Sequence, residues 1–426
     1  MTLTPEQEAL GRRNFMKALA GTPALAALGA AATLKGPVPG GPVRIGFIGI
    51  GGQGGFLLSV VDRAYAQIKA ICDINPGRFA KADETLAKNG HAPARHYAEW
   101  KEMLEKEDLE AVVIAVPLWA HADVVVGCLD AGKHVLCEKM MAWDVAGAER
   151  MREAAKKNRR ILEIAYQRFY NPMYEAAYEG IIKAGVLGDV YHTRLAWHRN
   201  QNWRRKGEPP SKDYDPKKWG YPTWEHLLNW RLYWRYSQGL FAELASHQIS
   251  VVNWFYGARP EAVLASGSVS RFKDGREVYD HCYATFEYSG GRTACFSSVE
   301  SNAFDDYYEE YFGTKGTLIL KRENEAMLFA EGKEGAAATS LELASKTGGP
   351  VLESSETQTP GAGAAQSSSG LQGFERRAGN VREIQGFCSA IRVSKPLHCG
   401  PDRAIESARA CILANQSAEK KNRITV

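Results

Sequence analysis

The chain has 426 residues, more than a single core usually organises, so two domains with appended segments are expected. Its formal net charge of +4 is small for this length and no long basic block occurs, which argues against nucleic-acid binding. The eight cysteines form no C-x-x-C pair and mostly lie in apolar runs. They are expected to be small core residues rather than metal ligands or disulfides, and no metal site is expected.

The first 41 residues are expected to be a signal and linker rather than part of the fold. Arg12 and Arg13 precede an Ala- and Leu-rich segment, Ala18 to Leu34, which is shorter and less apolar than a membrane-spanning helix. The pattern resembles a twin-arginine export signal followed by a Gly/Pro linker. This resemblance implies export of the folded protein to the periplasm through the twin-arginine machinery, without a stable membrane anchor. An amphipathic N-terminal tail is the alternative.

A short apolar strand followed at once by a glycine loop begins the first domain, residues 42–165. Val43 to Ile48 is rich in β-branched and aromatic residues, as a strand buried on both faces requires. Gly49, Gly51 and Gly54 then match G-x-G-x-x-G. In such loops the first glycine permits a tight turn, the second lets the backbone approach a pyrophosphate, and the third lets a helix pack on the strand. The loop predicts a dinucleotide site.

An acidic residue follows the second expected strand, where the ribose of a dinucleotide would lie. The apolar run Ile68 to Cys72 ends in Asp73. A carboxylate there accepts hydrogen bonds from the ribose hydroxyls and repels a 2′-phosphate, so NAD is favoured over NADP. Arg78 lies close enough along the chain to bind a phosphate or stack on adenine, which is the opposing interpretation.

Apolar strands alternate with amphipathic helices up to Ala165, which is the pattern of parallel βαβ units. Further strands are expected at 111–116, 134–137 and 161–165, and helices at 76–89, 98–106 and 121–129. The first domain is therefore predicted to be an α/β, Rossmann-like, doubly wound parallel sheet.

The segment Ala131 to Lys139, A-G-K-H-V-L-C-E-K, together with the glycine loop and the Pro117 to His121 turn, resembles the Gfo/Idh/MocA oxidoreductases of sugars and cyclitols. Met140 stands where that family usually has proline, and Leu118 where asparagine is common. The resemblance extends from Val43 to the C-terminus and implies NAD as the cofactor. The residues expected to bind it are Gly49, Gly51, Gly52, Gln53, Gly54, Asp73, Arg78, Pro117, His121, Glu138 and Lys139.

Lys139 is the first candidate for a catalytic role. It follows an expected parallel strand, and open α/β sheets bind ligands at the carboxyl ends of their strands. The matching lysine of the family hydrogen-bonds the substrate oxygen, and an ammonium there stabilises the alkoxide that develops as hydride leaves carbon. The alternative is a solvated loop lysine paired with Glu138.

Residues 166–426 are expected to form an α+β domain for substrate binding and oligomerisation, with a large open, mostly antiparallel sheet. A helix is expected at 174–183, and strands at 190–198, 262–269, 279–286, 292–299 and 309–320. Residues 335–373, rich in Gly, Ala, Ser and Thr, predict a mobile loop before C-terminal helices within 375–417. Relatives in the family commonly pair through the open face of the sheet, so a homo-oligomer is expected.

A helix expected from Gly239 to Tyr256 carries two further candidates. Glu243 and His247 are four residues apart and share one helical face. A carboxylate beside an imidazole fixes its tautomer and raises its basicity, which suits a general base near neutral pH. The family places an acidic residue, usually Asp, and a histidine at this spacing in its active site. A plain helical ion pair is the alternative.

The aromatic insert, Trp197 to Tyr236, holds six of the ten tryptophans of the chain. Indole faces stack on the C–H faces of sugar rings, which favours a carbohydrate platform. A local core or a subunit interface is an equal alternative. Arg205 is among the residues of the insert that would supply donors to hydroxyl groups. The expected substrate contacts are Tyr166, Arg168, Trp197, His198 and Tyr236, of which the first two have packing as an equal alternative.

These features predict an NAD(H)-dependent oxidoreductase acting on a hydroxyl of a sugar, glycoside or cyclitol. Lys139 would polarise the substrate oxygen and His247 would take or return its proton. Because a nicotinamide pool is not expected outside the cytoplasm, the cofactor should travel tightly held inside the exported protein. One alternative is a redox-neutral, NAD-dependent glycosidase with a 3-keto intermediate, whose additional base would be Tyr166, His198 or Tyr236. The other is a non-catalytic sugar-binding scaffold.

Overall fold

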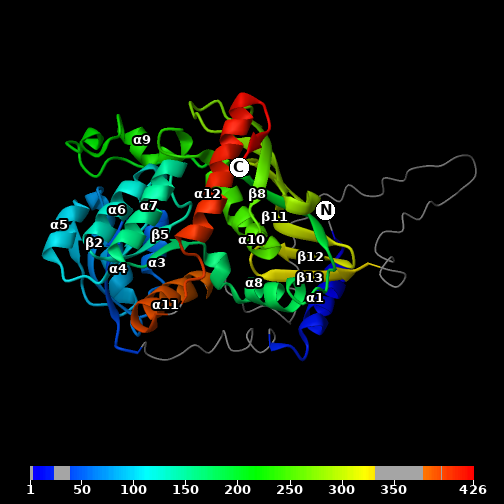
Figure 1. Cartoon of the computed structure of the whole chain (residues 1–426). Coiled ribbons are helices and arrows are strands. Elements are labelled where there is room, and N and C mark those ends of the chain that lie inside the picture. Colours follow the sequence, from blue (N-terminus) through cyan, green and yellow to red (C-terminus); the bar gives the residue numbers. More distant parts are fainter. Residues whose placement is uncertain (1–2, 24–38, 332–377, 395) are drawn as a thin grey trace, which may run out of the picture.

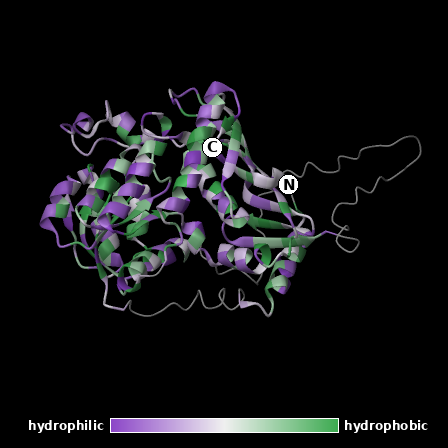
Figure 2. Cartoon of the chain, viewed as in Figure 1, coloured by the Kyte–Doolittle hydropathy of each residue, from purple (hydrophilic) through white to green (hydrophobic). Residues whose placement is uncertain are grey.

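The computed structural model describes residues 3–23, 39–331, 378–394 and 396–426. Two β-sheets, each with its own helices, lie next to one another (Figure 1). The expected loop at 335–373 lies outside the described residues, as do Gly36 to Val38 of the expected Gly/Pro linker. Hydrophobic residues are frequent in the strands of both sheets (Figure 2), and most of the buried core residues lie in strands and helices. All eight cysteines are free and seven are buried, as their apolar surroundings predict.

The first sheet has six parallel strands in the order β3-β2-β1-β4-β5-β6. The order reverses between β1 and β4, which is where doubly wound sheets open a crevice for ligands. β3 was not foreseen, because it is only three residues long and mostly exposed. The strands are β1 (Val43–Ile48), β2 (Ala66–Cys72), β3 (Arg95–Tyr97), β4 (Ala111–Ile114), β5 (His134–Glu138) and β6 (Leu162–Ala165).

Helices cover both faces of this sheet, and one of them comes from the C-terminal part of the chain. Ile384, Phe387 and Cys388 of α11 (Ala378–Val393) belong to the same buried cluster as Val43 and Phe47 of β1. The expectation that this helix completes the second domain is therefore wrong, because its apolar side packs on the first sheet. The other helices here are α3 (Gly52–Leu58), α4 (Phe79–Lys88), α5 (Trp100–Lys106), α6 (His121–Asp130) and α7 (Val145–Asn158).

The second sheet has eight strands in the order β13-β12-β11-β7-β10-β9-β8-β14, all antiparallel except the parallel pair β7 and β10. The single strand expected at 309–320 is instead the end of β11, a turn at Thr314 and Lys315, and most of β12. The strands are β7 (Val190–Asn200), β8 (Pro260–Ser268), β9 (His281–Tyr288), β10 (Thr293–Val299), β11 (Ser301–Gly313), β12 (Gly316–Lys321), β13 (Glu325–Ala330) and β14 (Ile424–Thr425).

One face of the second sheet is covered by α10 (Ser246–Tyr256) and α12 (Pro401–Lys420), which lie between it and the first sheet (Figure 1). Along β9 the side chains alternate, with Cys282, Ala284 and Phe286 buried toward the helices. On the opposite face Leu264 and Tyr283 are about half exposed, at 50% and 49%. The helix expected at 174–183 is α8 (Pro172–Ala177) continued by a π-helical turn.

The N-terminal residues include a packed helix, α1 (Pro5–Leu19), which lies against β13 (Figure 1). Gly11, Phe15 and Leu19 follow one another at intervals of four and are buried, so they form a stripe that fits the sheet. This corrects the expectation that no part of the first 41 residues belongs to the fold. In the described part of the chain no helix has the length and apolar character needed to cross a membrane.

Candidate active site

A cleft of about 530 Å³ lies at the carboxyl ends of β1, β2, β4 and β5, a size typical of small-molecule sites. Its lining comes from the glycine loop and strand ends of the first sheet, from the aromatic insert, and from the turn before α10. Every residue expected to bind NAD lines this cleft except Gly54. The second part of the molecule therefore meets the first at the crevice that the topology of the first sheet creates.

The glycine loop has the geometry that its spacing predicts. Gly49 has a φ of +87°, and a Cβ there would lie 2.6 Å from the carbonyl oxygen of Ala115. A Cβ at Gly54 would lie 1.9 Å from the carbonyl oxygen of Gly49, so only glycine lets α3 pack this closely. Gly51 and Gly52 face the cleft, where a side chain would occupy space that a pyrophosphate needs.

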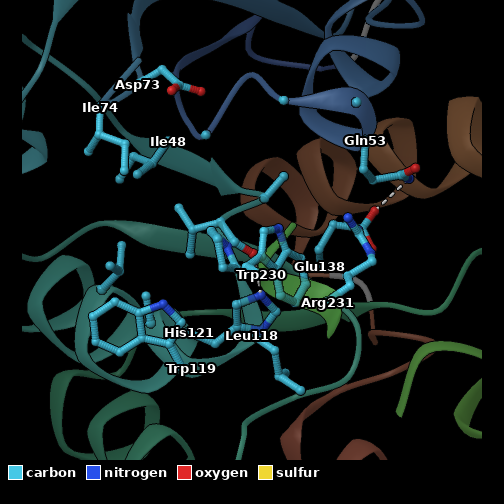
Figure 3. A pocket seen from close by; sticks show the side chains of 18 of the residues that line it. Ile48, Gln53, Asp73, Ile74, Leu118, Trp119, His121, Glu138, Trp230 and Arg231 are labelled. Carbon is cyan, nitrogen blue, oxygen red and sulfur yellow. Dashed lines mark hydrogen bonds between the residues drawn. The ribbon is translucent and has the colours of Figure 1, made fainter. Parts of the chain in front are cut away.

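Asp73 lies at one end of the cleft, next to Ile74 (Figure 3). Its carboxylate accepts hydrogen bonds from the backbone N–H groups of Ile50, at 2.9 Å, and Asn75, at 2.8 Å. Burial raises the pKa of Asp73, and the nearby Arg78, at 3.7 Å from the carboxylate, counteracts this. Each oxygen keeps a lone pair for a ribose hydroxyl, and Arg78 already has an acidic neighbour. This donor and acceptor set fits NAD.

His121 has a structural role at the site, because both of its ring nitrogens lie next to backbone carbonyl oxygens. Its Nδ1 lies 3.0 Å from the carbonyl oxygen of Met140, and its Nε2 lies 3.0 Å from that of Val116. The ring thus connects the end of β4 to the loop that follows β5. Burial lowers the pKa of His121, while the hydrogen bonds to the carbonyl oxygens of Val116 and Met140 oppose this shift.

Glu138 links the glycine loop to the candidate catalytic lysine. Gln53 Nε2 donates to Glu138 Oε1 at 2.8 Å, a contact visible in Figure 3, and the backbone N–H of Lys139 donates to Oε2 at 3.1 Å. Burial raises the pKa of Glu138. Its carboxylate therefore holds the backbone of Lys139 in place.

The side chain of Lys139 reaches the second part of the molecule. Its Nζ donates to the carbonyl oxygen of Glu243 at 3.0 Å and lies 4.0 Å from the carboxylate of the same residue. The side chain is only 12% exposed, so a solvated loop lysine is not what the structure contains. Burial lowers the pKa of Lys139, while the carboxylate of Glu243 raises it.

Glu243 has a second cationic partner that sequence reasoning missed. Arg231, from the aromatic insert, donates from Nε to Glu243 Oε2 at 2.9 Å. Although burial opposes ionisation, Arg231 and Lys139 lower the pKa of Glu243 to about 2. Glu243 lies in a π-helical turn, Phe241–Ala245, and its carboxylate orders the lysine. Its predicted effect on the tautomer of His247 stays a prediction.

His247 lies in the first turn of α10 and lines the same cleft as Lys139. Its ring packs edge to face on Tyr166, with centroids 6.1 Å apart, and lies 5.6 Å from the Trp197 ring. The imidazole is thus held between two aromatic rings, with 8% of the residue exposed. A general base requires this kind of fixed position.

Trp197 is the one predicted substrate contact that lines the cleft. Tyr166 is fully buried, and its hydroxyl accepts from Ser407 at 3.2 Å. Arg168 is buried as well and bonds Glu309 and Glu323, the second at 3.0 Å. Both therefore have the packing role that the sequence left open.

The other two predicted contacts also lie outside the cleft lining. The Nε2 of His198 lies 2.9 Å from the hydroxyl of Ser297 on the neighbouring strand. Tyr236 is fully buried, and its hydroxyl donates to the carbonyl oxygen of Gly220 at 3.1 Å. His198 thus contacts a neighbouring strand and Tyr236 packs within the insert, so neither side chain reaches the cleft.

The aromatic insert combines the two roles between which the sequence could not choose. Its inner residues form a small core, whose buried members are Tyr221, Leu232, Tyr233 and Tyr236. Several members, Tyr221 of this core included, line the cleft, and Trp119 of the first part lines it too. Those of the insert are Trp197, Arg205, Trp219, Tyr221, Trp224, Leu227, Leu228, Trp230 and Arg231. Figure 3 shows Trp230, Arg231 and Trp119 around the same cavity as Asp73 and Glu138. Clusters of aromatic and basic residues were the only sequence signal for them.

Comparisons with known proteins give relatives across most of the chain. The myo-inositol 2-dehydrogenase of Thermotoga maritima is 24% identical over 299 residues, 69% of this chain and 79% of that protein. A glycosyl hydrolase family 109 protein of Shewanella amazonensis is 27% identical over 263 residues, 55% of each chain. The crystal structure of an aldose-aldose oxidoreductase from Caulobacter crescentus superposes with a TM-score of 0.64 at 20% identity, covering 90% of this chain and all of that one.

Family comparisons agree for both parts of the molecule. The family described as "Oxidoreductase family, NAD-binding Rossmann fold" matches residues 43–166. The "GFO/IDH/MocA C-terminal domain" matches residues 176–319, so the two matches together cover more than half of the chain. The chain therefore belongs to the Gfo/Idh/MocA family of oxidoreductases, with NAD as its cofactor.

Proposed function

We propose that the protein oxidises or reduces a hydroxyl-bearing carbon of a sugar, glycoside or cyclitol, with Lys139 and His247 in acid–base roles. The observation that carries the proposal is that both side chains line one cleft with the glycine loop and Asp73. Bound in this cleft, NAD would supply the hydride acceptor or donor for the reaction. The residues that would hold NAD are those of the glycine loop, Asp73 and the Pro117 turn.

Lys139 and His247 divide the work on the substrate oxygen. The Lys139 ammonium, held by Glu243, donates to that oxygen and stabilises the charge that develops on it. The imidazole of His247 takes the hydroxyl proton in one direction and returns it in the other. Trp197 lines the same cavity, and its ring is stacked on Tyr307 with centroids 4.8 Å apart.

Relatives support the substrate class without naming the substrate. Two of them, from Thermotoga maritima and Rubrobacter xylanophilus, are named inositol 2-dehydrogenases. The WlbA dehydrogenase of Bordetella pertussis, which shares the fold, was crystallised with NADH and UDP-GlcNAcA. Polyhydroxylated rings are therefore the first compounds to test on this chain.

Substitution of the two candidate residues tests the proposal. Lys139→Ala and His247→Ala should each lower kcat by about 10²- to 10⁴-fold, the range for loss of a positioned proton-transfer group, while NAD still binds. Lys156→Ala, an exposed lysine on α7, is the control and should leave kcat unchanged. Wild-type turnover in both cleft variants would refute the mechanism. An absence of turnover of any polyol would favour the scaffold alternative.

A redox-neutral glycosidase is the second candidate, favoured by the similarity to the glycosyl hydrolase family 109 protein of Shewanella amazonensis. That chemistry needs a further base to remove a proton next to the oxidised carbon. Tyr166, His198 and Tyr236, the predicted candidates, do not line the cleft. Product analysis distinguishes the two functions, since oxidation leaves a keto product and hydrolysis leaves a free reducing sugar without net redox change.

We also propose export to the periplasm by the twin-arginine route, supported by Arg12 and Arg13 ahead of the Ala-rich segment. Arg13 is exposed on α1, whereas Arg12 pairs with Glu8 and Glu325. The double variant Arg12→Lys/Arg13→Lys keeps both charges and should leave the protein in the cytoplasm. Cell fractionation measures this, with Lys17→Arg as the control. Equal periplasmic amounts of both variants would contradict the proposal.

A further inference from the structure

We propose that the aromatic insert is a cover over the bound dinucleotide, and that Arg205 of this insert binds the pyrophosphate. NAD is then held as a resident group that leaves only when the insert moves. The inference depends on the NAD site of the first domain and does not depend on which substrate is turned over.

The insert crosses the cleft and is attached to the first domain at separate points. Tyr214 donates from its hydroxyl to the carbonyl oxygen of Ile74, the residue after Asp73, at 3.0 Å. Trp119 Nε1, which follows β4, donates to the hydroxyl of Tyr221 at 2.8 Å. In Figure 1 the helix α9 (Trp224–Leu228) of the insert lies over the end of the first sheet. A ligand in the cleft is therefore enclosed between the first sheet and the insert.

Arg205 extends from this cover toward the glycine loop. Its guanidinium is 3.6 Å from the position that a Cβ of Gly52 would take, and it lines the cleft. The guanidinium of Arg78, from the first domain, lies 3.3 Å from the position that a Cβ of Gly51 would take. Two arginines from different parts of the molecule thus border the two glycines whose backbone must approach the pyrophosphate.

The backbone of Arg205 is fixed, while its guanidinium is available. The Arg205 N–H donates to the side-chain oxygen of Asn229 at 2.6 Å, and Asn229 Nδ2 donates back to the Arg205 carbonyl at 3.1 Å. Asn229 is itself buried. Among the described residues the guanidinium of Arg205 forms no ion pair, in contrast to Arg204, which pairs with Glu225 and Asp274. Arg205 therefore carries a positioned positive charge into the cleft.

The charges around the cleft favour the binding of an anion next to the Arg205 guanidinium. Arg231 is neutralised by Glu243 and Arg78 lies against Asp73, but Arg205 has no such partner in the described structure. Burial, with Arg231 and Arg78 close by, lowers the pKa of Arg205 to about 10. A pyrophosphate supplies two negative charges and accepts the paired N–H groups of a guanidinium. Its binding relieves the mutual repulsion of these arginines.

Nucleotide binding tests the role of Arg205 separately from turnover. In Arg205→Ala, competition against NADH fluorescence should show ADP binding weakened by about tenfold to a hundredfold, as loss of a charged hydrogen bond implies, with adenosine unchanged. Arg205→Lys should restore part of the affinity. Lys206→Ala removes the same charge at the neighbouring exposed position, outside the cleft lining, and should match the wild type. Unchanged ADP binding, or equal losses for ADP and adenosine, would overturn the assignment.

The rate of NADH release tests the cover. Protein purified without added cofactor should retain close to one nucleotide per chain after gel filtration, and Arg205→Ala should retain less. Tyr214→Phe, which removes only the hydrogen bond to Ile74, should release NADH several-fold faster into excess competitor. Rapid release from the wild type, or an unchanged rate in Tyr214→Phe, would refute the cover. Neither readout involves oxidation of a sugar, so failure of the proposed function would leave this result standing.

Discussion

The Lys139 ammonium is held by two oxygens of one residue, the carbonyl of Glu243 at 3.0 Å and its carboxylate at 4.0 Å. The same carboxylate bonds Arg231, so one negative charge serves two cations in a largely buried place. Glu243 is a positioning residue in this arrangement, because it sets where Lys139 lies and how readily it keeps its proton. The ammonium has three N–H donors, so others remain for the substrate oxygen.

Removal of this charge should change the pH dependence of turnover. Burial lowers the pKa of Lys139 and Glu243 raises it, so Glu243→Gln should lower that pKa further. Because the ammonium is the active form, the alkaline limb of kcat against pH should move to lower pH in Glu243→Gln. Arginine stays protonated over the whole accessible pH range. Lys139→Arg should therefore have a lower kcat and show no alkaline limb in its pH profile. An alkaline limb at the same pH in Glu243→Gln and the wild type would contradict the role assigned to Glu243.

At the scale of elements, strand β6 carries a carboxyl group into the core between the two sheets. Glu163 is fully buried and accepts a hydrogen bond from the Tyr170 hydroxyl of the following turn. Burial raises the pKa of Glu163 to about 8 from its ordinary 4.5. The folded protein therefore keeps this group protonated at pH values where the unfolded chain has ionised it.

This difference makes stability depend on pH with a defined sign. Folding takes up a proton between pH 4.5 and about 8, so Glu163 lowers the free energy of unfolding as pH rises through that window. The slope is at most about 1.4 kcal/mol per pH unit. Glu163→Gln removes the slope while keeping the acceptor for Tyr170, so its advantage over the wild type should be small near pH 4.5 and largest near pH 8. Urea unfolding at pH 5, 6.5 and 8 measures this. Parallel curves for the two proteins would contradict it.

The turn after β6 contains a buried cation, Arg168, which bonds Glu309 and Glu323. Arg168→Met leaves two buried carboxylates without their cation and should cost about 3–5 kcal/mol of stability. The triple variant Arg168→Met/Glu309→Gln/Glu323→Gln removes all three charges and should recover much of the loss. Urea denaturation measures both. A triple variant less stable than the single one would show that the side chains matter for shape rather than charge.

At the scale of the whole molecule, the site exists only because two sheets dock with their helices between them. The first sheet supplies the glycine loop, Asp73 and Lys139, and the second part supplies His247 and the aromatic insert. The chain also returns from the second part to the first, since α11 from the C-terminal part packs on β1. On the outer face of the second sheet, Leu264 and Tyr283 are about half exposed among the residues that the structure describes.

We expect a homo-oligomer that pairs through this outer face. Leu264→Glu and Tyr283→Glu place charges on this face, on the neighbouring strands β8 and β9, and should each shift the mass in light scattering toward the monomer. Leu10→Glu, at an exposed apolar position on α1, is the control and should leave the mass unchanged. A wild-type monomer, or an unchanged mass in both sheet variants, would contradict the expectation.

Local chemistry explains what the sequence by itself determined. Gly49 needs a positive φ and Gly54 needs to touch the preceding backbone, which are requirements of a few neighbouring residues. Asp73 and Lys139 end strands whose apolar runs are visible in the sequence, so their place at the carboxyl edge of a parallel sheet follows. The cofactor cradle and the candidate lysine were therefore predictable.

Only the tertiary structure decided which distant groups meet. The pairing of Arg231 with Glu243, and the approach of Arg205 to Gly52, depend on how the insert folds over the first sheet. The same holds for Arg168, whose partners lie on and beyond β11, and for Phe15 of α1, which is buried against the second sheet. Periodicity and glycine spacing report the local backbone and the buried face of each element. These patterns do not identify the distant residue or element that a group will contact. Charges and apolar faces select their partners only when docking excludes water.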